Sequence, residues 1–190
     1  MKTVPGSRYL RFRCTGCGNC CKEPLLPLTD EDVKRIARHT GDSATEIVRW
    51  VDRHGIDMDD EPEAFVRLRQ GKRVMVLRHQ GGGCRYLGDD DRCTIYESRP
   101  LGCRVYPLDP EYNSKGKLRR LTIVRATECP YELDGNNDVE ELRVLHRRYS
   151  DAHEAFNRRI ADWNREQEAR RRKGRSAQTS REFLSFLGLD

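Results

Sequence analysis

The sequence has no long apolar run. No segment approaches the about 18 consecutive apolar residues that cross a membrane as a helix, and residues 1–8 lack the apolar stretch of a secretory signal. Leucine, isoleucine, valine and phenylalanine together supply 39 of 190 residues, close to the roughly 20% that is typical of disordered chains. We therefore expect a cytoplasmic protein with a thin hydrophobic core that does not enter a membrane.

The sequence also lacks the short motifs of several large enzyme classes. It contains no Walker loop, no G-x-G-x-x-G and no G-x-S-x-G, so nucleotide-dependent and serine-hydrolase chemistry have no support. A cysteine nucleophile is open, but no histidine with an Asn or Asp partner can be singled out for it. Whether the protein is an enzyme is undecided from the sequence, and no catalytic residue is assigned.

Cysteine, in contrast, is abundant, because the chain has eight of them. Structural disulfides are rare in a reducing cytosol, and the same residues there more often hold metal. We therefore favour metal ions as the partner, with zinc or iron as the cofactor and the identity undecided. Eight thiolates around two divalent ions would also offset most of the formal charge of +5, so the basic composition does not by itself indicate nucleic acid.

The first four cysteines follow the pattern C-x-x-C-x-x-C-C between Cys14 and Cys21. In a C-x-x-C step, a tight turn folds the second cysteine back over the first, so both sulfurs reach one ion, and zinc sites use this spacing. Two successive steps also supply three thiolates from one loop to an iron–sulfur cluster. Gly16 and Gly18 allow the loop to close. The pattern indicates metal and does not distinguish zinc from iron.

The adjacent pair Cys20 and Cys21 limits how the ligands divide. Neighbouring side chains diverge, so we expect the two sulfurs to serve two centres, or one of them to bridge. Zinc sites and cubane clusters usually take four ligands, and eight cysteines divide into two such sets. Cys129 is placed with the first loop because Cys129-Pro130 has the form of the Cys-Pro that ends ferredoxin-type runs. The predicted sets are Cys14, Cys17, Cys20 and Cys129, and Cys21, Cys84, Cys93 and Cys103.

The histidines are weaker candidates for metal ligands. Imidazole suits zinc and iron, but eight cysteines already satisfy two sites. His39 and His54 are expected near helix C-termini, where a cationic ring interacts favourably with the helix dipole. We therefore assign none of the five to metal: His39, His54, His79, His146 and His153.

Two capping boxes predict two helices in the first third of the chain. Thr29, three residues before an aspartate, predicts a helix over residues 30–40 that ends at a glycine. Ser43, three residues before a glutamate, predicts a second helix that runs from residue 44 to residue 54.

The period of the apolar residues then changes to that of strands. Residues 65–69 and 73–77 predict a β-hairpin. Brief strands are predicted at residues 94–96 and 118–126, and a helical turn that starts over residues 97–100 and carries Cys103. The sequence thus predicts an α+β fold built around cysteine-bound metal.

The last part of the chain differs from the rest. From residue 138 to about 173, apolar residues recur at intervals of three and four, which predicts one long amphipathic helix. Thr179 begins a further capping box, which predicts a short terminal helix after a linker at residues 174–178. We therefore expect a metal-binding domain over residues 1–135 and a helical extension over residues 136–190 packed on it.

Four stretches of the sequence together carry a family resemblance. They are Cys14-Thr-Gly-Cys17-Gly-Asn-Cys20-Cys21, Leu28-Thr29-x-x-Asp32, Cys84-x-Tyr-Leu, and the segment CTIYESRPLGCRVYP from Cys93 to Pro107, followed by a last cysteine at Cys129. Over residues 14–130 the chain resembles the YkgJ-type CxxCxxCC cysteine-cluster family, described as a zinc- or iron-chelating domain.

The resemblance implies a small bacterial protein that binds zinc, or iron as an iron–sulfur cluster, through these cysteines. Some relatives are flagellin lysine N-methylases, which are larger, and this chain lacks their extra length. An iron–sulfur redox protein, or an enzyme that modifies a peptide or protein, is therefore one alternative. A metal-binding structural module with a protein partner is another.

The family motif also includes Tyr96, Arg99, Arg104 and Tyr106, which lie between and after two of the predicted ligands. Such residues orient ligands or face a substrate in one interpretation. In the other, which we favour, the arginines bind loop carbonyls or Glu97 and the tyrosines are packed, because support of this kind is usual beside metal sites.

The sharpest basic run covers residues 170–175. A nucleic-acid adaptor that binds phosphates through this run is a further alternative. We favour the interpretation that these cations offset the dipole at a helix end, since positive charge elsewhere is interleaved with acid.

Overall fold

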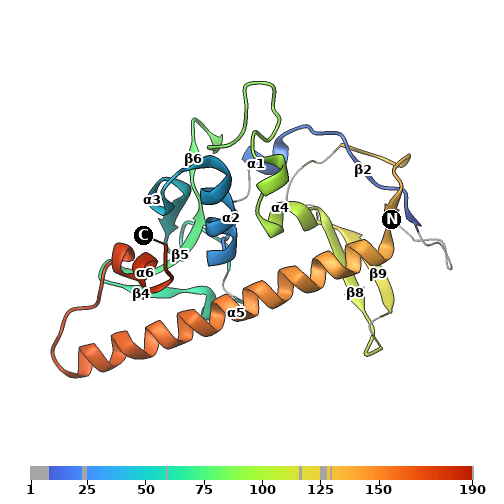
Figure 1. Cartoon of the computed structure of the whole chain (residues 1–190). Helices are drawn as coiled ribbons and strands as arrows, with labels where there is room; N and C mark the ends of the chain where they lie inside the picture. Colours follow the sequence, from blue (N-terminus) through green and yellow to red (C-terminus); the bar gives the residue numbers. More distant parts are fainter. Residues whose placement is uncertain are drawn as a thin grey trace. The chain divides into compact units, whose positions relative to one another are not determined.

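The computed structural model describes residues 9–22, 25–58, 60–115, 117–124, 128 and 130–189. The chain forms two compact units, each assembled from two segments. Unit 1 comprises residues 1–24 and 80–150, and unit 2 comprises residues 25–79 and 151–190. Helix α5 (Val139–Arg172) continues from one unit into the other (Figure 1). The mixture of helices and small sheets confirms the α+β prediction, while the predicted boundary at residue 135 stays a prediction.

Unit 1 is built from short elements. Its paired strands are β1 with β11, β2 with β10 and β8 with β9, all antiparallel, and no sheet in its described part is larger than two strands. A small core of four buried residues lies among them: Leu10, Phe12, Leu121 and Leu142. Besides the start of α5, the elements are β1 (Tyr9–Leu10), β2 (Arg13–Cys14), α1 (Asn19–Lys22), β7 (Gly83–Cys84), η2 (Tyr96–Ser98), α4 (Leu101–Val105), β8 (Leu108–Tyr112), β9 (Leu118–Ile123), β10 (Tyr131–Glu132) and β11 (Asn137–Asp138).

Unit 2 contains a three-stranded antiparallel sheet in the order β3-β5-β4. The hairpin β4–β5 confirms the prediction for residues 65–77, with Val66 opposite Arg73. Strand β6 pairs with β7 where the chain passes from unit 2 to unit 1. Besides the end of α5, the elements are α2 (Asp30–Thr40), α3 (Ala44–Ile47), β3 (Val48–Val51), η1 (Pro62–Ala64), β4 (Val66–Leu68), β5 (Gly71–Leu77), β6 (His79–Gln80) and α6 (Ser180–Phe186).

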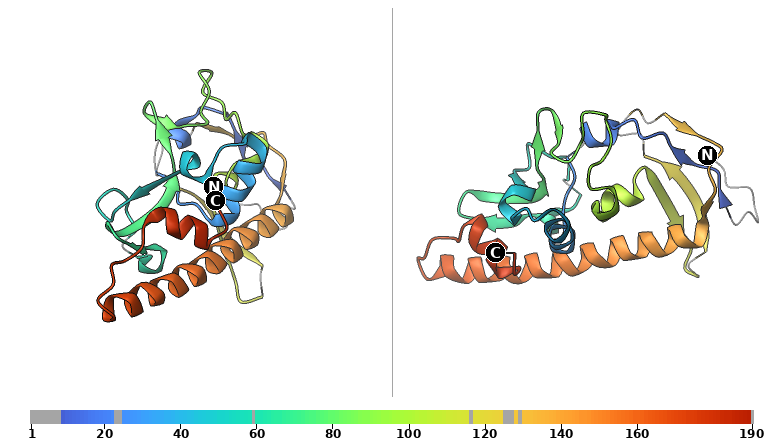
Figure 2. Two further views of the ribbon diagram at one scale, coloured as in Figure 1. Left: turned by 60° about the vertical axis from the view of Figure 1, so that its left-hand side comes forward. Right: turned by 45° about the horizontal axis from the view of Figure 1, so that its top comes forward.

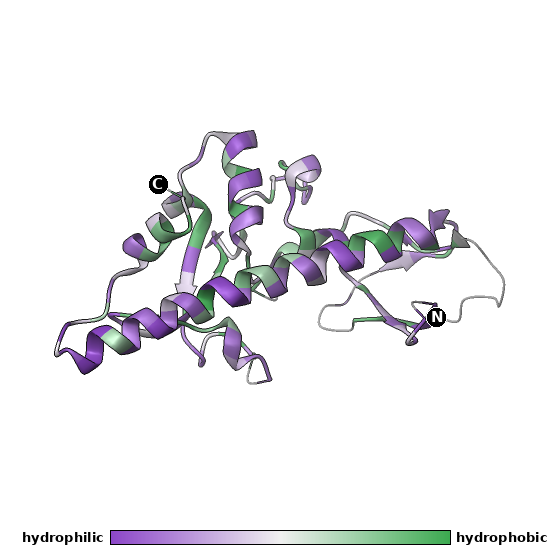
Figure 3. Cartoon of the chain, turned by 60° about the horizontal axis from the view of Figure 1, so that its bottom comes forward, coloured by the Kyte–Doolittle hydropathy of each residue, from purple (hydrophilic) through white to green (hydrophobic). Residues whose placement is uncertain are grey.

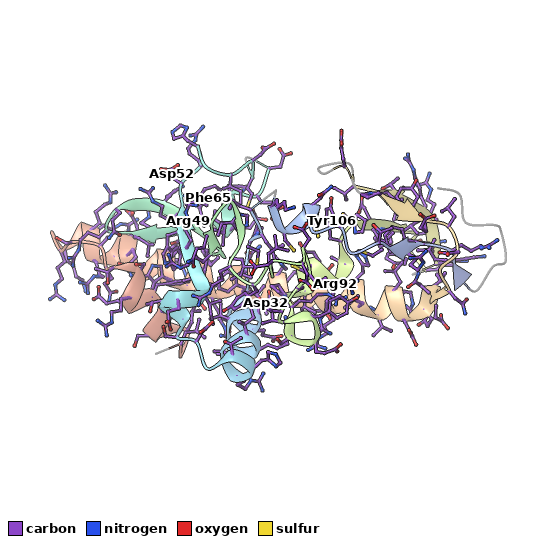
Figure 4. The ribbon with its side chains drawn as sticks, turned by 90° about the horizontal axis from the view of Figure 1, so that it is seen from above. Asp32, Arg49, Asp52, Phe65, Arg92 and Tyr106 are labelled. Carbon is purple, nitrogen blue, oxygen red and sulfur yellow. The ribbon has the colours of Figure 1, made fainter. Side chains whose placement is uncertain are left out.

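Helix α2 confirms the first predicted capping box. The Asp32 backbone N–H donates to Thr29 Oγ1 at 3.3 Å, and the Thr29 N–H donates to Asp32 Oδ2 at 3.1 Å. Both side chains are buried (Asp32 is labelled in Figure 4). Gly41 ends the helix with φ 78°, a backbone conformation that suits glycine.

The second predicted helix, over residues 44–54, is wrong beyond Ile47. Helix α3 ends there, and Val48–Val51 form strand β3, which pairs along its whole length with β5. The Arg78 guanidinium donates to the carbonyls of Thr45, Glu46 and Val48, which closes the end of the short helix. The tertiary pairing of two β-branched valines outweighs the local helical signal of the capping box.

The strand predicted at residues 94–96 is also wrong. The Thr94 N–H donates to the Tyr86 carbonyl at 2.9 Å, and the Ser98 N–H donates to the Ile95 carbonyl at 2.9 Å. These bonds turn the chain into the 3-10 helix η2. The predicted helical turn that carries Cys103 is confirmed by α4, which begins at Leu101. The strand predicted at residues 118–126 is confirmed by β9, which ends at Ile123, and residues 125 and 126 lie outside the described residues.

Helices α5 and α6 confirm the predictions for the end of the chain. Hydrophobic and hydrophilic residues alternate along α5 (Figure 3), and its residues Phe156, Ile160 and Trp163 are buried. Helix α6 packs beside the last part of α5 (Figure 2), where the Phe183 ring meets Trp163 edge-on with 5.1 Å between centroids. Trp163 Nε1 donates to the Arg67 carbonyl at 2.9 Å. No helix in the described part of the chain has the length and apolar character of a membrane span.

We expect Trp163→Ala to lower the free energy of unfolding of unit 2 by about 3–5 kcal/mol, because it removes a buried ring and leaves a carbonyl without its donor. Urea titration followed by the fluorescence of Trp50 measures this, since both tryptophans of the chain lie in unit 2. The control is Val144→Ala on the same helix, where the side chain is exposed. An equal urea midpoint for the two variants would contradict the packing described here.

Candidate metal centre

All eight cysteines belong to unit 1, and unit 2 has none. The seven that the structure describes are thiols, and none of them is joined by a disulfide to another described residue. Cys84 is buried, Cys14 and Cys20 are exposed, and the remaining four are half-buried: Cys17, Cys21, Cys93 and Cys103. Cys129 lies outside the described residues. The cysteine-rich part of the chain is therefore one compact unit.

The first loop begins at the end of β2 with Cys14 and ends in α1, which carries Cys20 and Cys21. Gly16 and Gly18 have φ of 70° and 71°, the left-handed region that residues with a Cβ rarely adopt. The Cys21 N–H donates to the Gly18 carbonyl at 2.9 Å. The two glycines thus fold the C-x-x-C steps back on themselves, as their spacing predicts.

A second loop, before Cys93, lies against the first one. A Cβ on Gly18 would stand 2.9 Å from the Asp91 carbonyl oxygen, so the two backbones approach closely at this point. Lys22 Nζ forms an ion pair with Asp91 Oδ1 at 2.7 Å. Gly83, next to Cys84, approaches Cys21 in the same way, with its Cβ position 3.2 Å from the Cys21 carbonyl oxygen.

This packing makes Cys20, Cys84 and Cys93 electrostatic neighbours. Burial raises the pKa of Cys84 to about 11, and the charges of Cys93 and Cys20 contribute. Burial also raises the pKa of Cys93, again with a contribution from Cys20. The pKa of Cys20 is raised first by its bond with Cys21. Three sulfurs from three separate stretches of the sequence therefore share one electrostatic environment.

Cys21 has different neighbours from Cys20. The bond to Asp91 is the main cause of a raised pKa at Lys22, and the charges of Cys17 and Cys21 add to it. Cys17 and Cys21 therefore act on one ammonium group, whereas Cys20 acts on Cys84. Apart from their bond with each other, the adjacent cysteines Cys20 and Cys21 thus interact with different groups.

Backbone N–H groups point at three of the sulfurs, each from the residue two positions later. Gly16 donates to Cys14 Sγ and Tyr86 donates to Cys84 Sγ, both at 3.4 Å. The backbone N–H of Ile95 bonds Cys93 and opposes the rise of its pKa. Donors of this kind stabilise thiolates and tune metal centres. The repeated geometry suits sulfurs that carry negative charge.

The residues on either side of Cys129 are held against the first loop. Asn19 Nδ2 donates to the Glu128 carbonyl at 2.7 Å, and Thr15 Oγ1 donates to the Pro130 carbonyl. Strand β10 pairs with β2, with Tyr131 opposite Cys14. Two polar residues inside the C-x-x-C steps, Thr15 and Asn19, thus bind the backbone on either side of Cys129.

No local signal in the sequence marks Thr15 and Asn19 as functional residues. Both are polar residues inside C-x-x-C steps, where a hydroxyl and an amide can reach a neighbouring backbone. Their partners are more than 100 positions away in the sequence, and nothing local predicts such a pairing. The ion pair of Lys22 with Asp91 was missed for the same reason.

The arginines of the family motif bind the backbone between Cys93 and Cys103. Arg99 Nη1 donates to the Tyr96 carbonyl at 3.1 Å, and its guanidinium stands 3.6 Å from the centroid of the Tyr96 ring. Arg104 donates to the carbonyls of Arg99 and Glu97. Arg99 also favours the thiolate forms of Cys20 and Cys93.

The two tyrosines of the motif differ in their surroundings. The Tyr96 side chain is exposed at 59%, and the Arg99 guanidinium lies over its ring. Tyr106 is half-buried at the end of α4 (labelled in Figure 4 with Arg92, which precedes Cys93). Roles of either side chain toward a ligand or a substrate stay predictions.

No histidine joins this group. Four of the five lie in unit 2, which has no cysteine: His39, His54, His79 and His153. His146 is in unit 1, on α5, where burial lowers its pKa and Asp109 opposes that effect. Among the described residues, no three His, Cys, Asp or Glu side chains stand in an arrangement that could hold a metal ion. The donors of the described residues fit a thiophilic metal by their chemistry, but their sulfurs do not enclose a site.

A family model matches residues 13–130, the part of the chain that contains every cysteine. It is the CxxCxxCC family, described as "Putative zinc- or iron-chelating domain". The chain belongs to this family. The match confirms the resemblance stated from the sequence motifs and supports metal binding at the level of zinc or iron.

A curated protein is also similar to the CxxCxxCC chain. The uncharacterized protein MJ0661 of Methanocaldococcus jannaschii is 29% identical over 110 residues, which cover 57% of this chain and 50% of the relative. The alignment thus spans half of the length of that protein. Its name states no activity. No solved structure matches the chain significantly.

We expect Gly18→Ala to loosen the contact between the two loops, and Gly16→Ala to do so far less. Both substitutions place a Cβ at positive φ, at roughly 1–2 kcal/mol each. Only at Gly18 does the new Cβ also meet a backbone oxygen, since nothing lies within 4 Å of the Cβ position of Gly16. Hydrogen exchange measured by mass spectrometry would show faster exchange in residues 84–93 for Gly18→Ala alone. Equal exchange in both variants would contradict the close approach.

Proposed function

We propose that unit 1 binds metal through its eight cysteines, in two centres with four thiolates each. The observation that carries this proposal is the shared environment of Cys20, Cys84 and Cys93, which come from three stretches of the sequence. A shared environment of thiols without disulfides is typical of metal ligation in a reducing compartment. The cytoplasmic location belongs to the same proposal.

The charge interactions of the sulfurs, rather than the backbone approach of Cys21 to Gly83, favour a division of ligands that exchanges Cys20 and Cys21 relative to the division predicted from the sequence. Cys20 interacts with Cys84 and Cys93, whereas Cys21 shares the ammonium of Lys22 with Cys17. The bonds to Glu128 and Pro130 support a place for Cys129 beside the first loop. The proposed sets are Cys20, Cys84, Cys93 and Cys103 for one centre, and Cys14, Cys17, Cys21 and Cys129 for the other.

Metal binding would resolve an electrostatic conflict at these sulfurs. Burial keeps the thiol of Cys84 protonated at neutral pH, with a pKa of about 11, whereas the N–H donors suit thiolates. A bound cation supplies the charge that makes deprotonation favourable, so binding releases protons and draws the sulfurs together. Because unit 1 has a small core, the free energy of binding would contribute directly to its folding.

The eight thiolates suit two kinds of metal. A tetrahedral set of four cysteines holds zinc as a closed structural site. The same ligands hold an iron–sulfur cluster, whose potential depends on hydrogen bonds to the sulfurs. An iron–sulfur cluster would agree with the alternative hypothesis from the sequence, in which the protein is a redox protein or an enzyme that modifies a peptide. The N–H donors at Cys14, Cys84 and Cys93 are compatible with both.

Metal and sulfide analysis of anaerobically purified full-length protein tests the proposal and separates its two forms. We expect either about two zinc ions per chain without visible colour, or iron with matching acid-labile sulfide and absorption in the visible range. Zinc alone would remove the redox alternative, and iron with sulfide would remove the structural zinc site. Neither metal in stoichiometric amount would contradict the proposal as a whole.

Pairs of Cys→Ser variants test which cysteines share a centre. We expect Cys20→Ser and Cys84→Ser each to remove one centre, and the double variant to lose no more metal than either single one. Cys14→Ser combined with Cys20→Ser should lose both centres. The reverse pattern, with Cys14 and Cys20 non-additive, would support the division predicted from the sequence instead. Metal content per chain is the measurement, and tryptophan fluorescence of unit 2 verifies that each variant is folded there.

A further inference from the structure

Cationic side chains from two distant segments gather on unit 2, away from any cysteine in the sequence. One segment is the turn between β4 and β5, and the other is the end of α5 with the residues after it. The turn lies beside the residues that lead from the end of α5 into α6 (Figure 1). We call this group the basic surface, and its members are Arg69, Lys72, Arg73, Arg170, Arg171, Arg172, Lys173 and Arg175.

Specific contacts hold the two segments together. The Arg69 N–H donates to the Gln178 carbonyl at 2.8 Å, and Arg69 Nε donates to the Ala177 carbonyl at 3.3 Å. Gln178 is itself fixed to α5, because its N–H donates to Oε1 of the buried Gln167 at 2.9 Å. The turn of the hairpin therefore stays beside the residues that follow α5.

Carboxylates neutralise only part of the basic surface. Glu168 pairs with Arg171 and Arg172, and Asp52 stands 3.8 Å from Arg73. Within the described part of the chain, no carboxylate forms an ion pair with Lys72, Arg170, Lys173 or Arg175. The dipole of α5 explains cations in its last turn, but not those on the hairpin or beyond the end of the helix.

The composition of the basic surface indicates the kind of partner. Arginine predominates among its members, and the planar fork of arginine suits phosphate oxygens. A regular array of phosphates offers a separate partner to each cation of this surface.

We propose that the basic surface binds the phosphate backbone of duplex nucleic acid, without reading its sequence. The hairpin turn and the residues after α5 contact separate phosphates of the duplex. The interaction does not depend on the metal centres, because unit 2 contains no cysteine. Binding of this kind is driven by release of counterions and weakens steeply with salt.

The test is fluorescence anisotropy of a labelled DNA duplex of about two helical turns, with the full-length protein between about 50 and 200 mM salt. The variant is the triple substitution Lys72→Gln, Lys173→Gln and Arg175→Gln. The matched control has the same loss of charge at exposed positions elsewhere on unit 2: Arg38→Gln, Arg53→Gln and Arg158→Gln. Tryptophan fluorescence during urea unfolding shows that unit 2 is folded in both.

We expect the first triple variant to bind at least about tenfold more weakly, with a log–log salt slope reduced by about 2 to 3. The control should retain both values. An RNA duplex and a second DNA sequence should bind with similar affinity, since only phosphates are contacted. No binding at low salt, or an equal loss in both triple variants, would overturn the proposal. So would tighter binding of a single strand or of an acidic peptide, because either would identify another class of partner.

Discussion

Unit 1 has to bring together sulfur atoms from separate segments of the chain. One cluster of its core has four buried members among the described residues, and polar contacts connect the cysteine loops. Asn19 binds the carbonyl before Cys129, and Lys22 binds Asp91. The close approaches at Gly18 and Gly83 leave no room for side chains between these loops. Every further feature of the proposed centres depends on this convergence.

The same convergence sets the charge state of the sulfurs. Burial raises the pKa of Cys84 and of Cys93, whereas backbone N–H groups favour both thiolates, with Arg85 acting on Cys84 and Arg99 on Cys93. In the proposed centres a thiophilic cation would remove this conflict, because it would stabilise thiolates that are already hydrogen-bonded. Folding and metal binding would then assist each other.

Unit 2 is stabilised in another way. The Phe183 ring packs against Trp163 and Trp50, and buried Asp30 is paired with Lys34 and with Arg159. This unit does not need cysteines for its core. The basic surface proposed on this unit is separate in the sequence from the cysteines that would hold metal.

Local signals in the sequence predicted several elements correctly. The capping boxes at Thr29 and Thr179 begin helices α2 and α6, and the apolar stripe over residues 138–173 forms α5. These predictions succeed because the bonds and the periodicity concern residues at most four apart. The capping box at Ser43 predicted too long a helix, since pairing with a distant strand decides where α3 ends.

The cysteine pattern by itself determined that the chain is a metal-chelating family member, because ligand type and spacing are properties of a short segment. It did not determine which sulfurs are neighbours. Whether Cys20 or Cys21 lies near Cys84 depends on how the loop of residues 88–92 packs on Gly18, and that contact joins segments about 70 positions apart. Likewise, the run at residues 170–175 became part of a surface only when the fold placed the β4–β5 turn beside it.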